Sequence, residues 1–316
     1  MKNGFNKQFA DEVVSGLSME EKRLSSKWLY NKRGDELFIE IMNLPEYYLT
    51  RCELEIFQSQ SQQIVKAFNA SETPFDLIEL GAGDGTKTIE LLKALKGREF
   101  TYRPIDISQN SLDHLQNRLR KEFDWLDVKA LQGDYFSVLS QLNTGRKKIV
   151  LFLGSNIGNL HDHEAQAFMS QLDAVLNHGD RVLLGVDLIK DTNIVLPAYN
   201  DPAGVTAKFN LNILDRINAE LGGDFDRLGF EHAPLYNEKD GWAKSYLRSK
   251  TRQTATLSKL NKAFQFEEGE LIFMEISRKY NDSILNKILD NSELGIVSKF
   301  TDQRSYFCDY MLEKAL

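Results

Sequence analysis

Three glycines and one aspartate carry the first chemical signal in the chain. An apolar run at residues 75–80 leads directly into a glycine turn formed by Gly81, Gly83 and Gly85. A second apolar run, at residues 100–105, delivers Asp106 at its end. Such runs predict two buried parallel strands, and a carboxylate after the second strand is where open α/β sheets hold ribose hydroxyls. The pattern therefore predicts a nucleoside-binding site.

The spacing of the glycines narrows the choice of nucleoside. A dinucleotide fingerprint reads G-x-G-x-x-G, so that a diphosphate can lie on the amino terminus of a helix. Here the third glycine comes one residue early, and the acidic Glu79 precedes the turn. This fits a ligand that has no phosphates but carries a ribose and an amino-acid end, such as S-adenosylmethionine. A tight turn without a ligand would show the same spacing, but Asp106 argues against that interpretation.

Two further turns follow predicted strands and add candidate residues. The run at 128–132 ends in Gly133-Asp134-Tyr135, where an acid and an aromatic ring could hold an adenine by hydrogen bonding and stacking. Alternatively, Asp134 caps the next helix. The run at 148–153 opens into a glycine- and asparagine-rich turn at 154–159. Both turns would lie at the carboxyl edge of the sheet, where ligands collect in this architecture.

The elements that must position these residues alternate between helix and strand. After a helical segment at residues 1–60, which Pro45 interrupts, the predicted helices are 55–68, one that begins near 86, 110–123 and 162–177, and the strands are 75–80, 100–105, 128–132, 148–153 and 181–189. From residue 190 the pattern changes to one helix at 201–221 and antiparallel strands at 230–236, 242–247, 251–257 and 271–277. A helix then resumes near 282, and runs at 295–300 and 305–311 predict a closing hairpin.

The predicted fold class is α/β. We expect a doubly wound, mostly parallel seven-stranded sheet of the class I methyltransferase type, because such sheets finish in a hairpin, and a second, smaller α+β domain. Residues 61–190 and 281–316 would form the core that binds S-adenosylmethionine. Residues 1–60 and 191–280 would form a substrate-binding domain from two separated segments.

Composition favours a small-molecule enzyme. The chain has 316 residues, 42% hydrophobic and 27% charged, as expected for one or two globular domains. Its net charge of -7 and lack of a basic run argue against a nucleic-acid partner. The amino terminus lacks the apolar segment of a signal peptide, and no stretch is apolar enough to span a membrane, so we expect a cytoplasmic protein without a membrane partner. The oligomeric state is open, and a monomer is our working expectation.

Metal and covalent chemistry find little support. His161 and His163 form an H-x-H pattern without a third ligand nearby in sequence, which favours two exposed histidines near a helix start. Cys52 and Cys308 lie far apart, and neither is in a paired spacing. No local pattern suggests a catalytic triad. We therefore expect no metal.

Several longer motifs resemble one family. Residues 27–38 read KWLYNKRGDELF and residues 44–51 read LPEYYLTR, which resembles the amino-terminal signature of the histidine N-alpha-methyltransferases of ergothioneine biosynthesis. The glycine turn, the turn at 154–159, the run AYND at 198–201 and the EIS triplet at 275–277 continue the likeness. It covers nearly the whole chain, and it implies methylation of the alpha-amine of L-histidine, up to the trimethylated betaine hercynine.

The resemblance also implies roles for individual residues. For S-adenosylmethionine it indicates Gly81, Lys87, Asp106, Asp134 and Tyr135. For the amino-acid substrate it indicates Tyr47, Asn159, Tyr199, Glu275 and Ser277, and it places Tyr30 near the reacting amine, so that Tyr30 and Tyr47 are the catalytic candidates. Two positions apart on a strand, Glu275 and Ser277 would point to the same side, where they could grip the two nitrogens of an imidazole.

One departure from the family pattern bears on the acceptor. Ser245 stands where the family often has an apolar methionine, at a position expected to border the imidazole pocket. An N-methyltransferase for another amino acid or an aromatic amine is therefore the alternative in the same class. A non-catalytic protein that binds S-adenosylmethionine is the alternative in another class, and a nicotinamide-dependent oxidoreductase is a remote one.

Overall fold

The chain divides into two compact units, each made of two separated segments. The computed structural model describes residues 6–70, 73–83, 85–140 and 144–315. Leu49–Ile189 with Arg278–Leu316 form one unit, here the parallel-sheet unit, and Met1–Tyr48 with Lys190–Ser277 form the other, here the antiparallel unit. The boundary predicted at residues 60 and 61 falls inside helix α3 (Leu49–Ala67), which belongs wholly to the parallel-sheet unit. The roles assigned to the two domains stay predictions.

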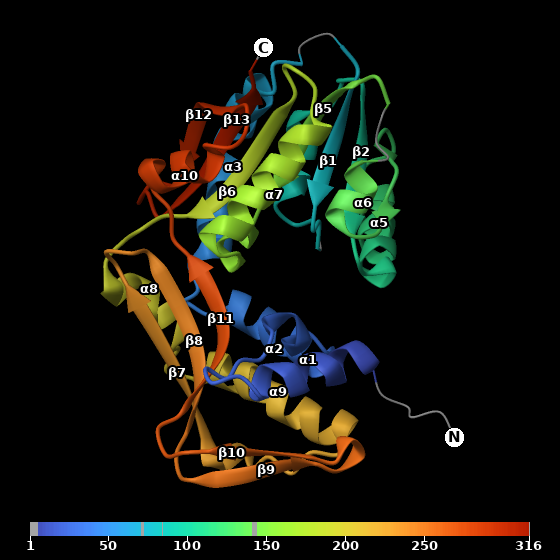
Figure 1. The fold of residues 1–316 in the computed structure, drawn as a ribbon. Helices are drawn as coiled ribbons and strands as arrows, with labels where there is room; N and C mark the ends of the chain where they lie inside the picture. Colours follow the sequence, from blue (N-terminus) through green and yellow to red (C-terminus); the bar gives the residue numbers. More distant parts are fainter. Residues whose placement is uncertain (1–5, 71–72, 84, 141–143, 316) are drawn as a thin grey trace. The chain divides into compact units, whose positions relative to one another are not determined.

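The parallel-sheet unit is built on one mixed sheet with the strand order β12-β13-β6-β5-β1-β2-β3, and β4 also pairs with β2 (Figure 1). Neighbouring strands from β6 to β3 are parallel, whereas β13 runs antiparallel to β6 and β12 antiparallel to β13. The predicted fold class, a doubly wound and mostly parallel sheet that closes in a hairpin, is confirmed. The strands are β1 (Phe75–Leu80), β2 (Phe100–Asp106), β3 (Asp127–Val128), β4 (Leu131–Gln132), β5 (Lys147–Phe152), β6 (Arg181–Asp187), β12 (Leu294–Thr301) and β13 (Phe307–Lys314).

The single strand predicted at 128–132 is wrong in detail. β3 pairs with Thr101 and Tyr102 of β2, and β4 pairs with Ile105 and Asp106 of the same strand. The two short strands thus occupy one edge position in line with each other. The interruption lies beside Pro104, which has no N–H to give to a ladder.

Helices cover both faces of this sheet. On one face α3 packs against α4 (Thr88–Ala94) and against the strands of the closing hairpin. On the opposite face a core of hydrophobic side chains joins the strands to α7 (Asp162–Val175) and α10 (Asp282–Leu289) (Figure 1). The remaining elements of the unit are α5 (Gln109–Glu122), α6 (Tyr135–Leu139) and the short 3-10 helix η2 (Asn156–Asn159). Strands buried on both faces explain the continuous apolar runs in the sequence.

The antiparallel unit has its own core. Apolar side chains from its amino-terminal helices, from α9 and from its strands form one cluster, so residues far apart in sequence fold together. Its helices are α1 (Lys7–Leu17), η1 (Ser26–Leu29), α2 (Lys32–Met42), α8 (Thr192–Tyr199), α9 (Val205–Leu221), η3 (Arg227–Gly229) and η4 (Ser258–Leu260). Its strands are β7 (Phe230–Asn237), β8 (Trp242–Ser249), β9 (Gln253–Leu257), β10 (Lys262–Phe266) and β11 (Leu271–Arg278), in sheets ordered β11-β8-β7 and β10-β9.

One α-helix and one strand of this unit were not predicted. The sequence indicated one helix at 201–221, but α8 precedes it and ends at Tyr199, and α9 begins only at Val205. Asp201 separates them, since its carboxylate accepts hydrogen bonds from the N–H groups of Val205 and Thr206, both at 2.8 Å. Strand β10 pairs with β9 and buries only two of its residues, so its sequence pattern is weak. Among the described residues, no helix is both long and apolar enough to cross a membrane.

Candidate active site

The glycine turn lies at the carboxyl end of β1, as predicted. Gly81, Gly83 and Gly85 have φ angles of 72°, 54° and 69°, a region that residues with a Cβ rarely adopt. A Cβ built on Gly81 would lie 2.7 Å from the Tyr135 hydroxyl, whereas one on Gly83 would meet open space. The turn therefore presents bare backbone with a tyrosine hydroxyl above it, which fits a ligand that approaches the main chain closely.

Asp106 and Tyr135 lie beside this turn. The carboxylate of Asp106 ends β2 and accepts a hydrogen bond from Ser108 N at 2.9 Å. The half-buried ring of Tyr135 packs edge-on against Phe152, with centroids 6.0 Å apart. Burial, and then the charge of Asp106, raise the pKa of Tyr135, so its hydroxyl stays a neutral hydrogen-bonding group. The structure thus brings three predicted cofactor residues, Gly81, Asp106 and Tyr135, to one edge of the sheet.

Asp134 plays the capping role that the sequence left open as an alternative. Its carboxylate accepts from Phe136 N at 3.2 Å and Ser137 N at 3.0 Å, and also from the Ser137 hydroxyl. These bonds, led by that of the Ser137 side chain, lower the pKa of Asp134. The side chain is exposed at the amino terminus of α6. Its contact with an adenine stays a prediction.

Glu79, the acid that precedes the turn, is buried. Its carboxylate is 4% exposed and accepts hydrogen bonds from the hydroxyls of Thr88, at 2.7 Å, and Tyr102. Desolvation raises the pKa of Glu79 to about 7, against the opposing effects of these two hydroxyls and of Lys87. Glu79 therefore links the end of β1 to α4 and β2.

Lys87 is held by a residue that the sequence did not single out. Its ammonium forms an ion pair with Glu53 of α3, and the other Glu53 oxygen accepts from Gly154 N at 2.8 Å. Burial alone would lower the pKa of Lys87, but the charge of Glu53 raises it above its ordinary value. The signal was present in the sequence: Glu53 lies among Cys52, Ile56 and Phe57 on the apolar face of a helix.

Asn159 belongs to a strained turn in the same unit. It is exposed at the end of η2, which follows β5. Ser155, at the start of this turn, has a φ of 59° although it is not a glycine, and its hydroxyl accepts from Asp187 N at 3.0 Å. This bond fixes the turn to β6. Asn159 therefore lies at the carboxyl edge of β5, and its contact with a substrate stays a prediction.

Tyr30 and Tyr47 belong to an aromatic cluster in the antiparallel unit. The ring of Tyr30 meets those of Phe38 and Phe209 edge-on, with both centroid distances 5.5 Å, and Phe38 also meets Tyr47 at 6.5 Å. The side chain of Tyr30 remains 42% exposed. Its pKa nevertheless lies well above the ordinary value, because the surrounding protein partly desolvates the hydroxyl and because Glu275 and then Tyr47 disfavour a second negative charge. The structure therefore brings Tyr47 and Glu275 within electrostatic reach of Tyr30.

Tyr199 and Ser277 also meet. The Tyr199 hydroxyl donates to Ser277 Oγ at 2.8 Å, and the Tyr199 carbonyl accepts from His232 Nε2 at 2.8 Å. Glu275 lies two residues before Ser277 on β11. Ser245 lies on the adjacent strand β8, is 3% exposed and stands opposite Pro234 of β7.

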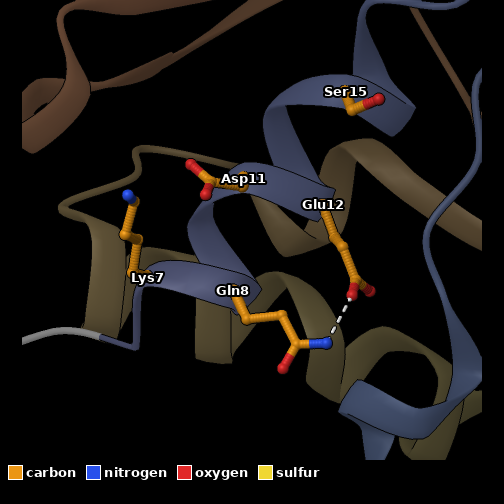
Figure 2. A pocket seen from close by; sticks show the side chains of 5 residues that line it. All are labelled: Lys7, Gln8, Asp11, Glu12 and Ser15. Atoms are coloured by element: carbon orange, nitrogen blue, oxygen red, sulfur yellow. Dashed lines mark hydrogen bonds between the residues drawn. The ribbon is translucent and has the colours of Figure 1, made fainter.

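Two other features include none of the predicted site residues. His161 and His163 are exposed and stack at 5.9 Å, and no group of three or more His, Cys, Asp or Glu side chains in the described chain could hold a metal. A shallow hollow along α1 is lined by Lys7, Gln8, Asp11, Glu12 and Ser15 (Figure 2). These are successive positions on the polar face of one helix, and none is a predicted site residue.

Comparison with known proteins identifies the family. The family model described as histidine-specific methyltransferase, SAM-dependent, matches residues 9–314. A histidine N-alpha-methyltransferase of Mycobacterium tuberculosis (strain CDC 1551 / Oshkosh) is 36% identical over 298 residues, which cover 94% of this chain and 92% of that relative. Ergothioneine biosynthesis protein 1 of Schizosaccharomyces pombe is 32% identical. The match covers 94% of this chain but only 40% of that relative.

Among solved structures, an S-adenosylmethionine-dependent methyltransferase from Clostridium acetobutylicum ATCC 824 is similar at 14% identity, with a TM-score of 0.47 over 90% of this chain and 100% of that one. The family model spans both units and both segments of each. The chain therefore belongs to the histidine-specific, S-adenosylmethionine-dependent methyltransferases.

Proposed function

We propose that this protein transfers methyl groups from S-adenosylmethionine to the alpha-amine of L-histidine, up to the trimethylated betaine. The observation that carries the proposal is the match of a histidine-specific family model to residues 9–314, together with a relative of that activity that is 36% identical. Each unit by itself offers groups that suit the chemistry. The parallel-sheet unit has a bare glycine turn, and the antiparallel unit has a carboxylate, hydroxyls and aromatic rings.

The methyl donor would be held by the parallel-sheet unit. S-adenosylmethionine supplies an electrophilic methyl group on a sulfonium. Asp106 would accept hydrogen bonds from ribose hydroxyls, Gly81 would allow close backbone approach, and Lys87 would face the carboxylate of the amino-acid end. Asp134 and Tyr135 would hold the adenine. The open space over Gly83 and the hydroxyl over Gly81 support this assignment.

The acceptor would be held by neutral and acidic groups. Glu275 and Ser277 would bind the imidazole nitrogens, and Tyr47, Asn159 and Tyr199 would orient the amino-acid end. The raised pKa of Tyr30 keeps its hydroxyl protonated, so we assign it to hydrogen bonding near the amine and not to removal of a proton as a phenolate. Displacement at a methyl group depends above all on alignment of the reacting atoms, which can lower the activation barrier by roughly 7 to 11 kcal/mol. Aromatic rings would also tolerate the growing methylammonium by cation–π contact.

Mass spectrometry of the product tests this proposal. Purified protein, S-adenosylmethionine and L-histidine should give histidine that gains mass in steps of one methyl, whereas N-alpha-acetylhistidine, whose amine is blocked, should gain none. Unchanged histidine would contradict the proposal. The same assay decides between mono-, di- and trimethylation.

Ser245 favours one alternative, in which the preferred acceptor is not histidine. A small, buried polar residue at this position would enlarge the pocket and offer a hydroxyl, so another amino acid or an aromatic amine could be preferred. A panel of amino acids compared by kcat/KM should rank histidine first, and a low rank would establish the alternative. Cofactor binding without methylation of any acceptor in the panel would instead indicate a non-catalytic protein.

The remaining expectations concern the setting of the enzyme. We propose a small-molecule substrate without a nucleic-acid partner, a monomeric state and a location in the cytoplasm. Light scattering of the eluted protein gives the molar mass directly, and a mass of twice 36.2 kDa would exclude the monomer.

A further inference from the structure

Behind Lys87 lies a buried cluster of acids that the reaction as described does not use. Glu53 of α3 is 0% exposed, pairs with Lys87 through one oxygen, and accepts from Gly154 N through the other at 2.8 Å. It therefore joins Lys87, the residue that precedes α4, to the turn after β5. A residue from a helix that precedes the whole sheet thus fixes the orientation of a cation at the sheet's carboxyl edge.

Asp309 of β13 closes this cluster on its buried side. It is 0% exposed, and neither carboxyl oxygen has a hydrogen-bond partner among the described residues. Gly185 of β6, its neighbour in register, makes the room: a Cβ there would overlap Glu53 Oε1 and lie 2.9 Å from Asp309 Oδ1. Burial, and then the charge of Glu53, raise the pKa of Asp309 well above its ordinary range, which disfavours its charged form.

Such a cluster is a costly way to fill a core. Buried carboxyl groups lose their hydration, and apolar side chains of similar volume often stabilise a fold better than a buried ion pair does. The cluster has one open side, because the Lys87 side chain is 23% exposed while that of Glu53 is 1% exposed. That side lies next to Gly154, whose Cβ position is 3.4 Å from Lys87 Nζ.

We propose that Glu53 is a positioning residue of the cofactor site, which aims the Lys87 ammonium at the α-carboxylate of S-adenosylmethionine, and that Asp309 closes the buried side of this pair. Glu53 takes one of the three ammonium donors and leaves the others for a ligand. An uncharged Asp309 leaves the pair Lys87 and Glu53 neutral in sum, so that an incoming carboxylate is not repelled by a second buried anion. The inference rests on the proposed contact of Lys87 with the cofactor.

Two ligands that differ only in the amino-acid end test this inference. S-adenosylhomocysteine carries the carboxylate, and 5′-methylthioadenosine lacks it. By titration calorimetry, Glu53→Gln should lower the affinity for S-adenosylhomocysteine on the order of tenfold, the effect expected for a misplaced charged hydrogen bond. The affinity for 5′-methylthioadenosine should change by less than about twofold. Equal losses for both ligands, or no loss for either, would overturn the proposal.

Matched variants separate positioning from stability. Asp180→Asn is the control, because it disturbs a comparable buried pair. Lys148 Nζ lies 3.4 Å from Asp180 Oδ2, and the Lys148 backbone N–H donates to Asp180 Oδ1. Asp180 precedes β6 and so lies at the opposite edge of the sheet. It should leave the ratio of the two affinities unchanged. Asp309→Asn, which mimics the uncharged acid, should keep S-adenosylhomocysteine affinity within about twofold. A tenfold loss there would show that a charged Asp309 is needed.

A double-mutant cycle covers the case in which Glu53→Gln folds poorly. In a Lys87→Met background, Glu53→Gln should cause no further loss of S-adenosylhomocysteine affinity, because the cation it positions is gone. A loss as large as in the natural background would show that Glu53 acts independently of Lys87. These measurements need no acceptor, so they can fail while histidine methylation holds. Absence of S-adenosylhomocysteine binding to the unaltered protein would instead remove the assignment of the cofactor residues.

Discussion

Glu79 is a carboxyl group that the protein keeps from water although it adjoins the glycine turn. The hydroxyls of Tyr102 and Thr88 bind it, Lys87 attracts its charged form and Glu53 repels it, yet desolvation dominates and raises its pKa to about 7 from an ordinary 4.5. The native state therefore holds a proton between these pH values that the unfolded chain has released. Native stability attributable to Glu79 must fall as pH rises through this window and level off above it.

Glu79→Gln should remove this pH dependence. A pKa shift of this size corresponds to ~3 kcal/mol. Between about pH 5 and about pH 8, the free energy of unfolding of the unaltered protein should therefore fall by ~3 kcal/mol more than that of the variant. Urea unfolding at several pH values measures it. The exposed control Glu238→Gln should keep the slope of the unaltered protein. Identical slopes for Glu79→Gln and the unaltered protein would contradict the assignment.

The individual residues of the site differ in how far the sequence could predict them. Asp106 and the glycines follow from strand ends and spacing, because parallel strands bring their carboxyl ends to one edge. Tyr199, Glu275 and Ser277 came only from family resemblance, since a strand pattern gives no reason to single them out. Asp309 could not be found at all, because its environment depends on Gly185 of another strand. Long-range packing of this kind leaves no local trace.

At the scale of elements, the β1–α4 turn depends on two glycines for different reasons. Gly83 and Gly85 both have positive φ, but a Cβ on Gly83 would meet open space, whereas one on Gly85 would overlap Leu115 Cδ1 of α5. Backbone strain should therefore be common to both positions. Steric conflict with α5 should be particular to Gly85.

Alanine substitution at each glycine should separate the two effects. Gly83→Ala should cost ~1–2 kcal/mol for the left-handed backbone, and Gly85→Ala should cost ~1–3 kcal/mol more for the overlap. Urea unfolding of both variants measures the difference. Leu115→Ala combined with Gly85→Ala should destabilise by less than the sum of the single changes, since the overlap is gone. Equal stabilities of the two glycine variants would show that α5 yields without cost.

Element prediction succeeded where the pattern was long and failed where short elements depend on tertiary pairing. Strand β1 and the closing hairpin were predicted close to their observed bounds. Strands β3 and β4, with two residues each, exist only by pairing with β2. Helix α8 was not predicted, and it contains Pro197, a residue type that is unfavourable inside a helix.

At the scale of the whole molecule, each unit is assembled from segments distant in sequence. In the sequence, the alternation of helices and strands changes at residue 190, which indicated the inserted segment. In the structure, the antiparallel unit resumes at Lys190. The first crossing was harder, because the break at Pro45 does not show which unit the next helix joins, and only packing assigns α3 to the sheet. Predicted cofactor residues all fall in the parallel-sheet unit. Predicted acceptor residues, apart from Asn159, fall in the antiparallel unit.

This distribution predicts a division of labour between the units. Glu275→Ala removes a carboxylate from the antiparallel unit, so it should raise the KM for histidine by at least tenfold and change the Kd for S-adenosylmethionine less than about twofold. Asp106→Ala removes a hydrogen-bond acceptor at the end of β2 and should do the reverse. Steady-state kinetics and calorimetry on both variants provide the comparison. If the two substitutions weakened cofactor binding equally, the units would not divide the substrates, and the assignment of Glu275 to the acceptor would have to be abandoned.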